Sequence, residues 1–338
     1  MLLFCIAALH CRCSLIDDDL TNCGYSYKMM YSLQLATGLQ LELDEALNEE
    51  ADQPIKQAVL RYLSPVFTDN AHDVDLSFFV QSEDKRTCYL NEVINSNRSS
   101  LSFYLPVDDY VHLAVANIKD NSLMNICDST SSATMRLSLD GGDRIGVQRT
   151  GVFTARRPIL LQDTVGNQEL DVILYMANCA AVLVLDTTGE SIKDLQVEVR
   201  GTADEFMLND SVYGFSRKVV VEAENVINHT GREMPRHLPT AINDTLNHRV
   251  GYAAVCLPSS DMPDDNGNYW TMAVYATLDD GSVTETLLDF KTPLPASHAK
   301  VIKAEMQGKG EIVPIGAPEV GATVTLQWKS GGEHDVEL

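Results

Sequence analysis

The chain has 338 residues, of which 45% are hydrophobic, so it is long and apolar enough for two domains with their own cores. Its formal net charge is −23, and no lysine-rich or arginine-rich run reverses that charge locally. The charge excludes nucleic acid and anionic lipid surfaces as partners, because like charges repel. Solubility accounts for such acidity, and complementarity to a basic partner is the alternative.

The first segment of the chain, residues 1–9, is almost wholly apolar. It is too short to span a bilayer, which takes about 20 residues, but it has the length of the apolar region of a signal peptide. No Lys or Arg precedes it, and small residues are missing just before the next cysteines. A start codon assigned too late would explain the missing basic end. A buried N-terminal strand is the alternative.

Alternation of apolar and polar residues dominates the rest of the chain and predicts many short strands. One apolar face and one polar face are typical of antiparallel sheets that pack on one side. Turn sequences such as Asp279-Asp280-Gly281 separate the strands, as in β-sandwiches. The predicted strands are 25–35, 76–80, 101–105, 195–199, 219–221, 270–278 and 323–328.

One segment, residues 49–67, has the three-and-four spacing of an amphipathic helix. Asp52 is the predicted N-cap, Pro54 fits the first turn, and Pro65 is expected to end or kink the helix. The predicted apolar face consists of Ile55, Val59, Tyr62, Leu63 and Val66.

The polar stretch 162–168 predicts a domain boundary, and the apolar run 172–185 would open the second domain. The expected organisation is a signal remnant and tether at 1–23, an N-terminal β-sandwich at 24–165 and a C-terminal β-sandwich at 166–338. The helix would then be a short insertion in the first sandwich.

No motif for catalysis or cofactor binding is present: the sequence has no GxGxxG, no GxxxxGK[ST] and no GxSxG. The Asp-rich segment 261–268 fails the calcium-loop pattern at Met262 and is predicted to be a hairpin turn between Leu257 and Tyr269. His237 and His248 are expected to be solvated, and Trp270 and Trp328 to lie in the core rather than bind sugars. We therefore expect no enzyme, no cofactor and no metal.

The eight cysteines include no CxxC pair and no zinc spacing. Cys23, Cys88, Cys127, Cys179 and Cys256 follow Cys13, and most of them are expected to be small buried residues.

The segment from Cys13 to Cys23 is the most specific signal in the sequence. It contains Cys13, the acidic run Asp17, Asp18 and Asp19, Leu20 and Cys23. It strongly resembles the opening of the mature chain in Bacteroidetes-type minor fimbrial lipoproteins, the FimB family of fimbrial anchor subunits. Arg12, just before Cys13, departs from the small residues of a lipoprotein signal.

This resemblance implies two tandem transthyretin-like β-sandwich domains. It also implies a signal peptide, an acylated (palmitate-type) Cys13, and a lipid-anchored, surface-exposed protein at the cell outer membrane. The acidic run Asp17, Asp18 and Asp19 would direct surface export. The implied function is to anchor a pilus shaft, through contact with a fimbrial shaft subunit, and to end its assembly. A surface glycan-binding lipoprotein and a fimbrial tip adhesin are the alternatives.

The C-terminal tail offers no long donor strand for a neighbouring subunit. After the strand at 323–328 comes a Ser-Gly-Gly turn and then six residues, which are expected to fold back as a hairpin. Subunits that join by strand exchange need a terminal strand beyond their own domain. We therefore expect a monomer in isolation and one copy per fimbrium.

Overall fold

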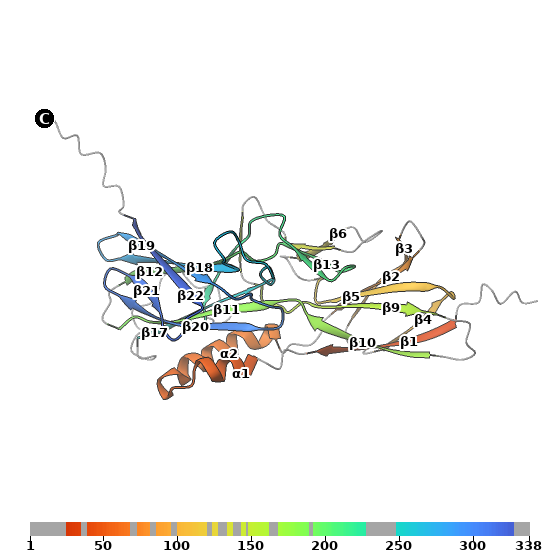
Figure 1. The fold of residues 1–338 in the computed structure, drawn as a ribbon. Helices are drawn as coiled ribbons and strands as arrows, with labels where there is room; N and C mark the ends of the chain where they lie inside the picture. The colour runs from red at the N-terminus through yellow and green to blue at the C-terminus, as the bar shows by residue number, and fades with distance from the viewer. Residues whose placement is uncertain are drawn as a thin grey trace, which may run out of the picture.

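The computed structural model describes residues 25–34, 39–67, 73–81, 86–95, 100–119, 124–127, 134–137, 143–146, 148–161, 168–188, 192–227 and 248–327. Within these ranges the α-helices are α1 (Leu39–Ala46) and α2 (Gln53–Phe67), and most of the remainder is strand. The predicted all-β sandwich class with a short helical segment is confirmed. Figure 1 shows an elongated molecule in which β1 begins at one end and β22 ends at the other.

The first sandwich is one sheet folded into two layers. Its strand order is β3-β2-β5-β9-β10-β1-β4. β9 and β10 pair at only two positions, Tyr175 with Thr154 and Met176 with Phe153, so the sheet separates beyond that corner. The bounds are β1 (Tyr25–Gln34), β2 (Asp73–Gln81), β3 (Arg86–Asn95), β4 (Ser100–Leu105), β5 (Asp109–Ala116), β9 (Phe153–Leu160) and β10 (Gln168–Met176).

Strand β5 is buried along almost its whole length because it has layers on both faces. Ala114 and Ala116 face the apolar interior that contains Tyr27 of β1. Val111, Leu113 and Val115 pack into the other apolar cluster, which includes Phe206. Phe206 belongs to a four-stranded sheet made of β14 (Val212–Gly214), β13 (Glu205–Met207), β7 (Thr134–Leu137) and β6 (Met124–Cys127).

The second sandwich consists of a five-stranded and a six-stranded sheet. The first contains β16 (Glu224–Asn225), β17 (Arg249–Cys256), β11 (Cys179–Asp186), β20 (Ala299–Gln307) and β21 (Glu311–Pro314), in that order. The second contains β22 (Val320–Gln327), β19 (Val283–Phe290), β18 (Trp270–Leu278), β12 (Ile192–Arg200), β15 (Val220–Glu222) and β8 (Arg144–Ile145).

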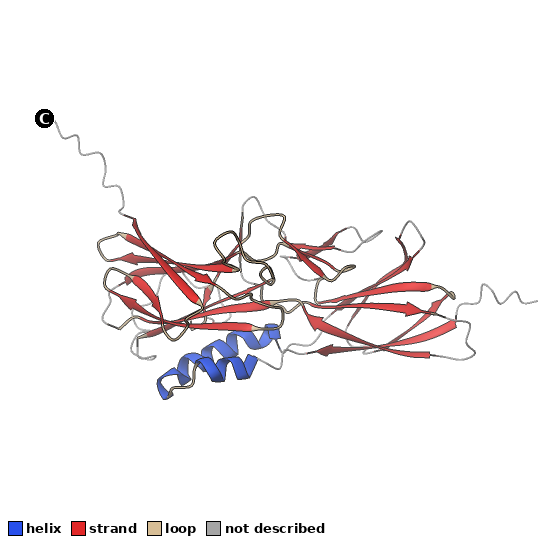
Figure 2. Ribbon diagram, viewed as in Figure 1, coloured by secondary structure: helices blue, strands red, loops and turns tan. Residues whose placement is uncertain are grey.

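The two helices form a third layer on the second sandwich, although they lie in sequence between two strands of the first (Figure 2). α1 contacts β20, and α2 contacts β17. β11 therefore has apolar side chains on both faces: Ala180, Val182 and Val184 face the helix layer, and the alternate residues face the six-stranded sheet. The expected insertion in the first sandwich thus covers the second. Only long-range packing could place it there.

Helix α2 has the apolar face that its sequence predicts: Ile55, Val59, Tyr62, Leu63 and Val66 are all buried. The predicted N-cap is wrong. Asp52 lies in a short 3-10 turn, η2 (Glu50–Asp52), and its carboxylate accepts the Glu49 N–H at 3.4 Å. Pro54 lies in the first turn as expected, and the helix continues past Pro65 to Phe67. Helix α1 is absent from the prediction because most of its partners lie far away in the sequence.

The apolar run 172–185 forms two strands, separated by Ala177 and Asn178. β10 pairs with β1 in the first sheet, and β11 enters the second. Asn178 is fully buried at this crossover; its side-chain oxygen accepts the Val152 N–H at 2.7 Å, and its carbonyl accepts the Ser297 N–H at 2.7 Å. The domain boundary at 165/166 stays a prediction. The chain itself passes from the first sandwich to the second after Met176, where β10 ends.

Candidate interaction edge at β22

Strand β22 is the last strand of the six-stranded sheet, and within the described residues it pairs with β19 alone. Its register places Val320, Ala322 and Val324 opposite buried residues of β19, so these three side chains point to the inner face of the sheet. Val320 is buried, but residues 321–325 are all exposed. We call this exposed part of the strand, residues 321–325, the β22 edge.

The inner face of the β22 edge is only partly covered by the five-stranded sheet, since Ala322 and Val324 stay exposed there. β21 is the last strand of that sheet, and it contacts both β19 and β22. The Thr286 hydroxyl of β19 accepts the Ile312 N–H of β21 at 3.2 Å, and the Thr284 hydroxyl donates to the Lys309 carbonyl at 2.5 Å. These bonds hold β19 to the β21 hairpin and close the sandwich at this point. Val324, on the inner face, is 39% exposed.

The chemistry of the β22 edge suits pairing with another strand. β22 has the sequence VGATVTLQ, with no charged residue and no proline. Natural edge strands are commonly protected by charges, prolines or bulges, because their free N–H and C=O groups can pair with other chains. β21, the neighbouring edge, carries Glu311 and Pro314, and β3 carries Arg86 and Glu92. The β22 edge lacks this protection.

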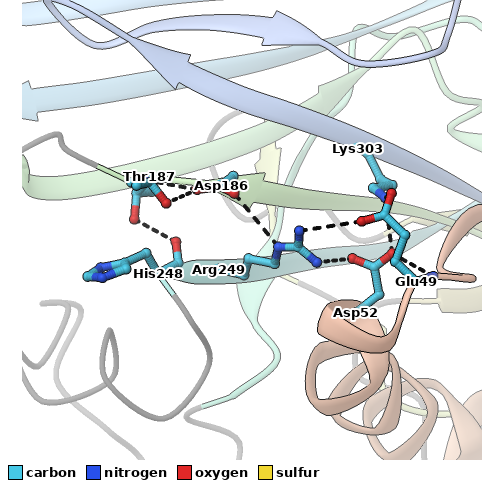
Figure 3. Close-up of polar contacts among 8 residues, drawn as sticks. Glu49, Asp52, Asp186, Thr187, His248, Arg249 and Lys303 are labelled. Carbon is cyan, nitrogen blue, oxygen red and sulfur yellow. Dashed lines mark hydrogen bonds and ion pairs between the residues drawn. The ribbon is translucent and has the colours of Figure 1, made fainter.

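The helix layer is held to the second sandwich by a buried ion cluster (Figure 3). The Asp52 side chain is fully buried; it pairs with Arg249 of β17 and, at 3.0 Å, with Lys303 of β20. Glu49 pairs with Lys303 at 3.0 Å. Burial alone would lower the pKa of Lys303, but the two carboxylates outweigh it and raise this pKa. The cluster satisfies its own charges and serves packing.

A groove of about 640 Å³ lies between α1, β20 and the segment around Ile315. Most of its charged lining is paired within the protein: Glu42 accepts from His298 at 2.5 Å, and Lys300 pairs with Glu319 at 2.6 Å. The pairing with Lys300 lowers the pKa of Glu319. A ligand that bound to one of these paired charges would first have to break an ion pair within the protein.

The predicted site residues Cys13, Asp17, Asp18 and Asp19 lie outside the described residues. The structure therefore leaves lipidation and the export signal as predictions. β1, which follows this segment, begins at the end of the molecule opposite to the β22 edge (Figure 1). No helix within the described ranges is both long and apolar enough to cross a bilayer.

Trp270 lies in the core, as predicted. Its ring stacks on Phe290 at 3.6 Å between centroids, and its indole N–H donates to the Thr292 carbonyl at 3.1 Å. It is 2% exposed and cannot act as a sugar platform. Trp328 and His237 lie outside the described residues.

The Asp-rich segment 261–268 forms a turn, but the predicted hairpin is wrong, because the flanking strands β17 and β18 belong to different sheets. The Asp264 carboxylate accepts the N–H groups of Asn266 at 2.9 Å and Asn268 at 2.8 Å, and Gly267 has a positive φ of 78°. Across the part of the chain that the structure describes, no group of three or more His, Cys, Asp or Glu could hold a metal ion.

The comparisons with known proteins identify the fold. No family model matches the chain, and no curated protein matches it in sequence. Two solved structures from Bacteroides ovatus, both described as candidate adhesins, have TM-scores of 0.50 to it. The first is 9% identical, and its alignment covers 86% of this chain and 88% of that structure's chain. The second is 10% identical, and its alignment covers 92% of this chain and 96% of that structure's chain.

The fimbrial anchor protein Mfa2 from Porphyromonas gingivalis is also similar, with a TM-score of 0.47, 10% identity and coverage of 90% of this chain and 99% of its own. The chain has the fold of the Bacteroides adhesin structures. The predicted all-β sandwich fold is thus confirmed.

Proposed function

We propose that this protein is a non-enzymatic fimbrial subunit that anchors a pilus shaft to the outer membrane and ends its assembly. The observation that carries the proposal is the β22 edge: an uncharged strand, with exposed side chains on its inner face, at the far end of the molecule from β1. A shaft subunit would add a strand there, with backbone hydrogen bonds for affinity and Ala322 and Val324 for apolar contact. It would take the place of the hairpin expected of the C-terminal tail, which lies outside the described residues.

The other end of the molecule would attach to the membrane. Lipid on Cys13, followed by the acidic run Asp17 to Asp19, would hold the first sandwich at the cell surface. One acyl chain gives only marginal membrane binding, whereas two or more give a stable anchor. A lipoprotein cysteine with several acyl chains could therefore hold a fimbrium to the membrane. The strongly acidic body, with a net charge of −23, would be repelled by anionic headgroups and point outward.

The decisive experiment compares the Val324→Lys and Tyr104→Lys variants in binding to the purified shaft subunit. Val324 lies on the β22 edge, whereas Tyr104 lies on the edge strand of the first sandwich and is 74% exposed. A lysine on the inner face of β22 would place a charge against the added strand. We expect Val324→Lys to abolish capture of the shaft subunit and Tyr104→Lys to retain it. Equal capture by both variants contradicts the proposed contact.

Lipidation has a separate test. In full-length protein expressed in a Bacteroidetes host, Cys13→Ala should move the protein from the membrane fraction to the soluble fraction and release fimbriae into the medium. Cys11→Ala is the matched control, since Cys11 lies two positions away on the same segment. If Cys13→Ala still incorporates a palmitate analogue, the anchor lies elsewhere.

A tip adhesin or a glycan-binding surface lipoprotein is the second candidate, and exposed aromatic side chains favour it. Tyr104 on β4 and Tyr175 on β10 are 74% and 57% exposed. Aromatic rings on an open sheet face can stack on apolar faces of ligands. If this role holds, Tyr104→Ala with Tyr175→Ala would abolish adhesion to host glycans and leave fimbrial attachment intact.

A further inference from the structure

Two cysteines face each other across neighbouring strands of the second sandwich. Cys179 opens β11 and Cys256 closes β17, and the register of these antiparallel strands places the two residues directly opposite. Their sulfur atoms are 3.6 Å apart. Both side chains are fully buried in the same apolar cluster.

This placement satisfies the main geometric requirement for a crosslink. Directly opposed residues in an antiparallel pair have Cα atoms about 4.5–5.5 Å apart, and disulfides are found at Cα separations of about 4.4–6.8 Å. The two thiols already point toward each other, so the S–S bond needs side-chain rotation and a small backbone adjustment. Cys88, the other cysteine whose side chain is described, has its sulfur near the Leu90 carbonyl instead.

The crosslink would lie at the crossover between the sandwiches. Cys179 follows Asn178, whose side chain and carbonyl hold the segments around Val152 and Ser297. The two cysteines are 77 positions apart in the sequence. A covalent bond between them would close a long loop that contains β12 and β15, and long loops lose the most chain entropy when they are closed in the unfolded state.

We propose that Cys179 and Cys256 form a structural disulfide when the chain folds in an oxidising compartment. The oxidant is a disulfide, either on a thiol–disulfide oxidoreductase or in a small molecule such as oxidised glutathione. One cysteine thiolate attacks it and forms a mixed disulfide; the second thiolate then displaces the carrier. The two cysteines lose two protons and two electrons, and the oxidant is reduced to two thiols. This inference goes beyond the anchor function and does not depend on it.

Oxidation would precede burial of the pair. Exchange requires a thiolate. In the folded protein, burial raises the pKa of the Cys179 thiol, and the neighbouring Cys256 raises it further. In the folded protein the Cys179 thiol is thus protonated and both sulfur atoms are buried away from the oxidant, whereas the unfolded chain exposes both thiols. Oxidised glutathione should therefore act during folding and only slowly afterwards.

The test refolds the full-length chain from denaturant in a mixture of reduced and oxidised glutathione, blocks free thiols and maps peptides without reduction. We expect one dominant crosslinked peptide pair, containing Cys179 and Cys256. The crosslinked protein should melt roughly 5 °C or more above the same protein after reduction. Oxidant added after folding should crosslink far less in the same time.

Two matched variants complete the test. Cys179→Ser with Cys256→Ser should remove both the crosslinked peptide and the difference in melting temperature between oxidising and reducing conditions. Cys88→Ser should leave both unchanged. The proposal is overturned if Cys179 and Cys256 are both recovered as blocked free thiols from natively refolded protein, or if either one pairs predominantly with another cysteine.

Discussion

Each sandwich has an edge strand without charged residues, β4 in the first and β22 in the second. The inner side chains are buried along β4 but partly exposed along β22. On β4 the inner residues Phe103 and Leu105 are 4% and 0% exposed, whereas on β22 the inner residue Val324 is 39% exposed. An uncharged edge strand therefore does not by itself mark a binding edge; what decides is whether the opposite layer covers its inner face.

The physical reason lies in the opposing layer. Phe103 packs against Phe78 of β2, with ring centroids 5.3 Å apart, so β4 is covered by the other half of its folded sheet. β22 is covered less completely: β21 contacts it but ends at Pro314, and Val324 stays exposed. The comparison predicts that substitutions on β4 change stability, whereas those on β22 change association.

The largest expected effect comes from the inner face of β4. Phe103→Ala should lower the free energy of unfolding by about 3–5 kcal/mol, because a fully buried aromatic ring is removed from a packed interior. Val324→Ala should lower it by less than about 1 kcal/mol, because that side chain is already partly in water. Urea unfolding of both variants measures the difference. Similar losses at the two positions would show that the β22 edge is covered after all.

The first sandwich should also carry a pH dependence of its own. His112 is fully buried on β5, and this burial lowers its pKa from 6.5 to about 4. The hydrogen bond to the Ser77 carbonyl raises the pKa in part, and the positive charge of Arg157 lowers it further. The unfolded chain binds the proton between these two values and the folded chain does not. Stability should therefore fall as the pH drops from 6.5 to 4, by a total of about 3 kcal/mol from this residue.

Urea unfolding at several pH values checks this dependence. His112→Phe retains a ring that can stack on Phe78 and cannot bind the proton. Its stability should vary less steeply than that of the natural protein between pH 4 and 6.5. The carboxylates contribute equally to both proteins, so the difference in slope isolates His112. Parallel curves would mean that His112 becomes protonated within the fold.

A smaller effect is expected where the second sandwich closes. Thr286→Val keeps the shape of a fully buried side chain but removes the acceptor of the Ile312 N–H. An unpaired buried donor costs about 1–3 kcal/mol, so the variant should be destabilised by that amount. Thr323→Val, on the exposed strand next to it, should change stability by less than about 0.5 kcal/mol. Equal effects would argue against the bond between β19 and β21.

The smallest effect on stability is expected from Val324→Lys. The side chain is exposed, and the lysine can extend into water, so the free energy of unfolding should change by less than about 0.5 kcal/mol. Thermal and urea unfolding measure it. This variant is the one expected to lose the shaft subunit, so an intact fold separates loss of binding from loss of structure. A large destabilisation would place Val324 in the core.

The local features of this protein follow from its sequence alone. Alternation predicts strands such as β18, where Trp270 is buried as expected, and three-and-four spacing predicts the buried face of α2. These patterns can be recognised in the sequence because the face on which a side chain lies is set by its position along the strand or helix. The N-terminal cysteine and acidic run predict the fimbrial resemblance, and the sandwich fold that this resemblance implies is confirmed.

Contacts between distant elements were decided only by the tertiary structure. The helices lie between strands of the first sandwich but cover the second, held through Asp52, Arg249 and Lys303. Cys179 and Cys256, 77 positions apart, become neighbours when β11 pairs with β17. Val324 has the pattern of a buried strand residue, yet it is 39% exposed, although β21 of the opposite sheet contacts its strand. Periodicity specifies which face of an element is apolar; the layer that meets that face is set by packing across the whole chain.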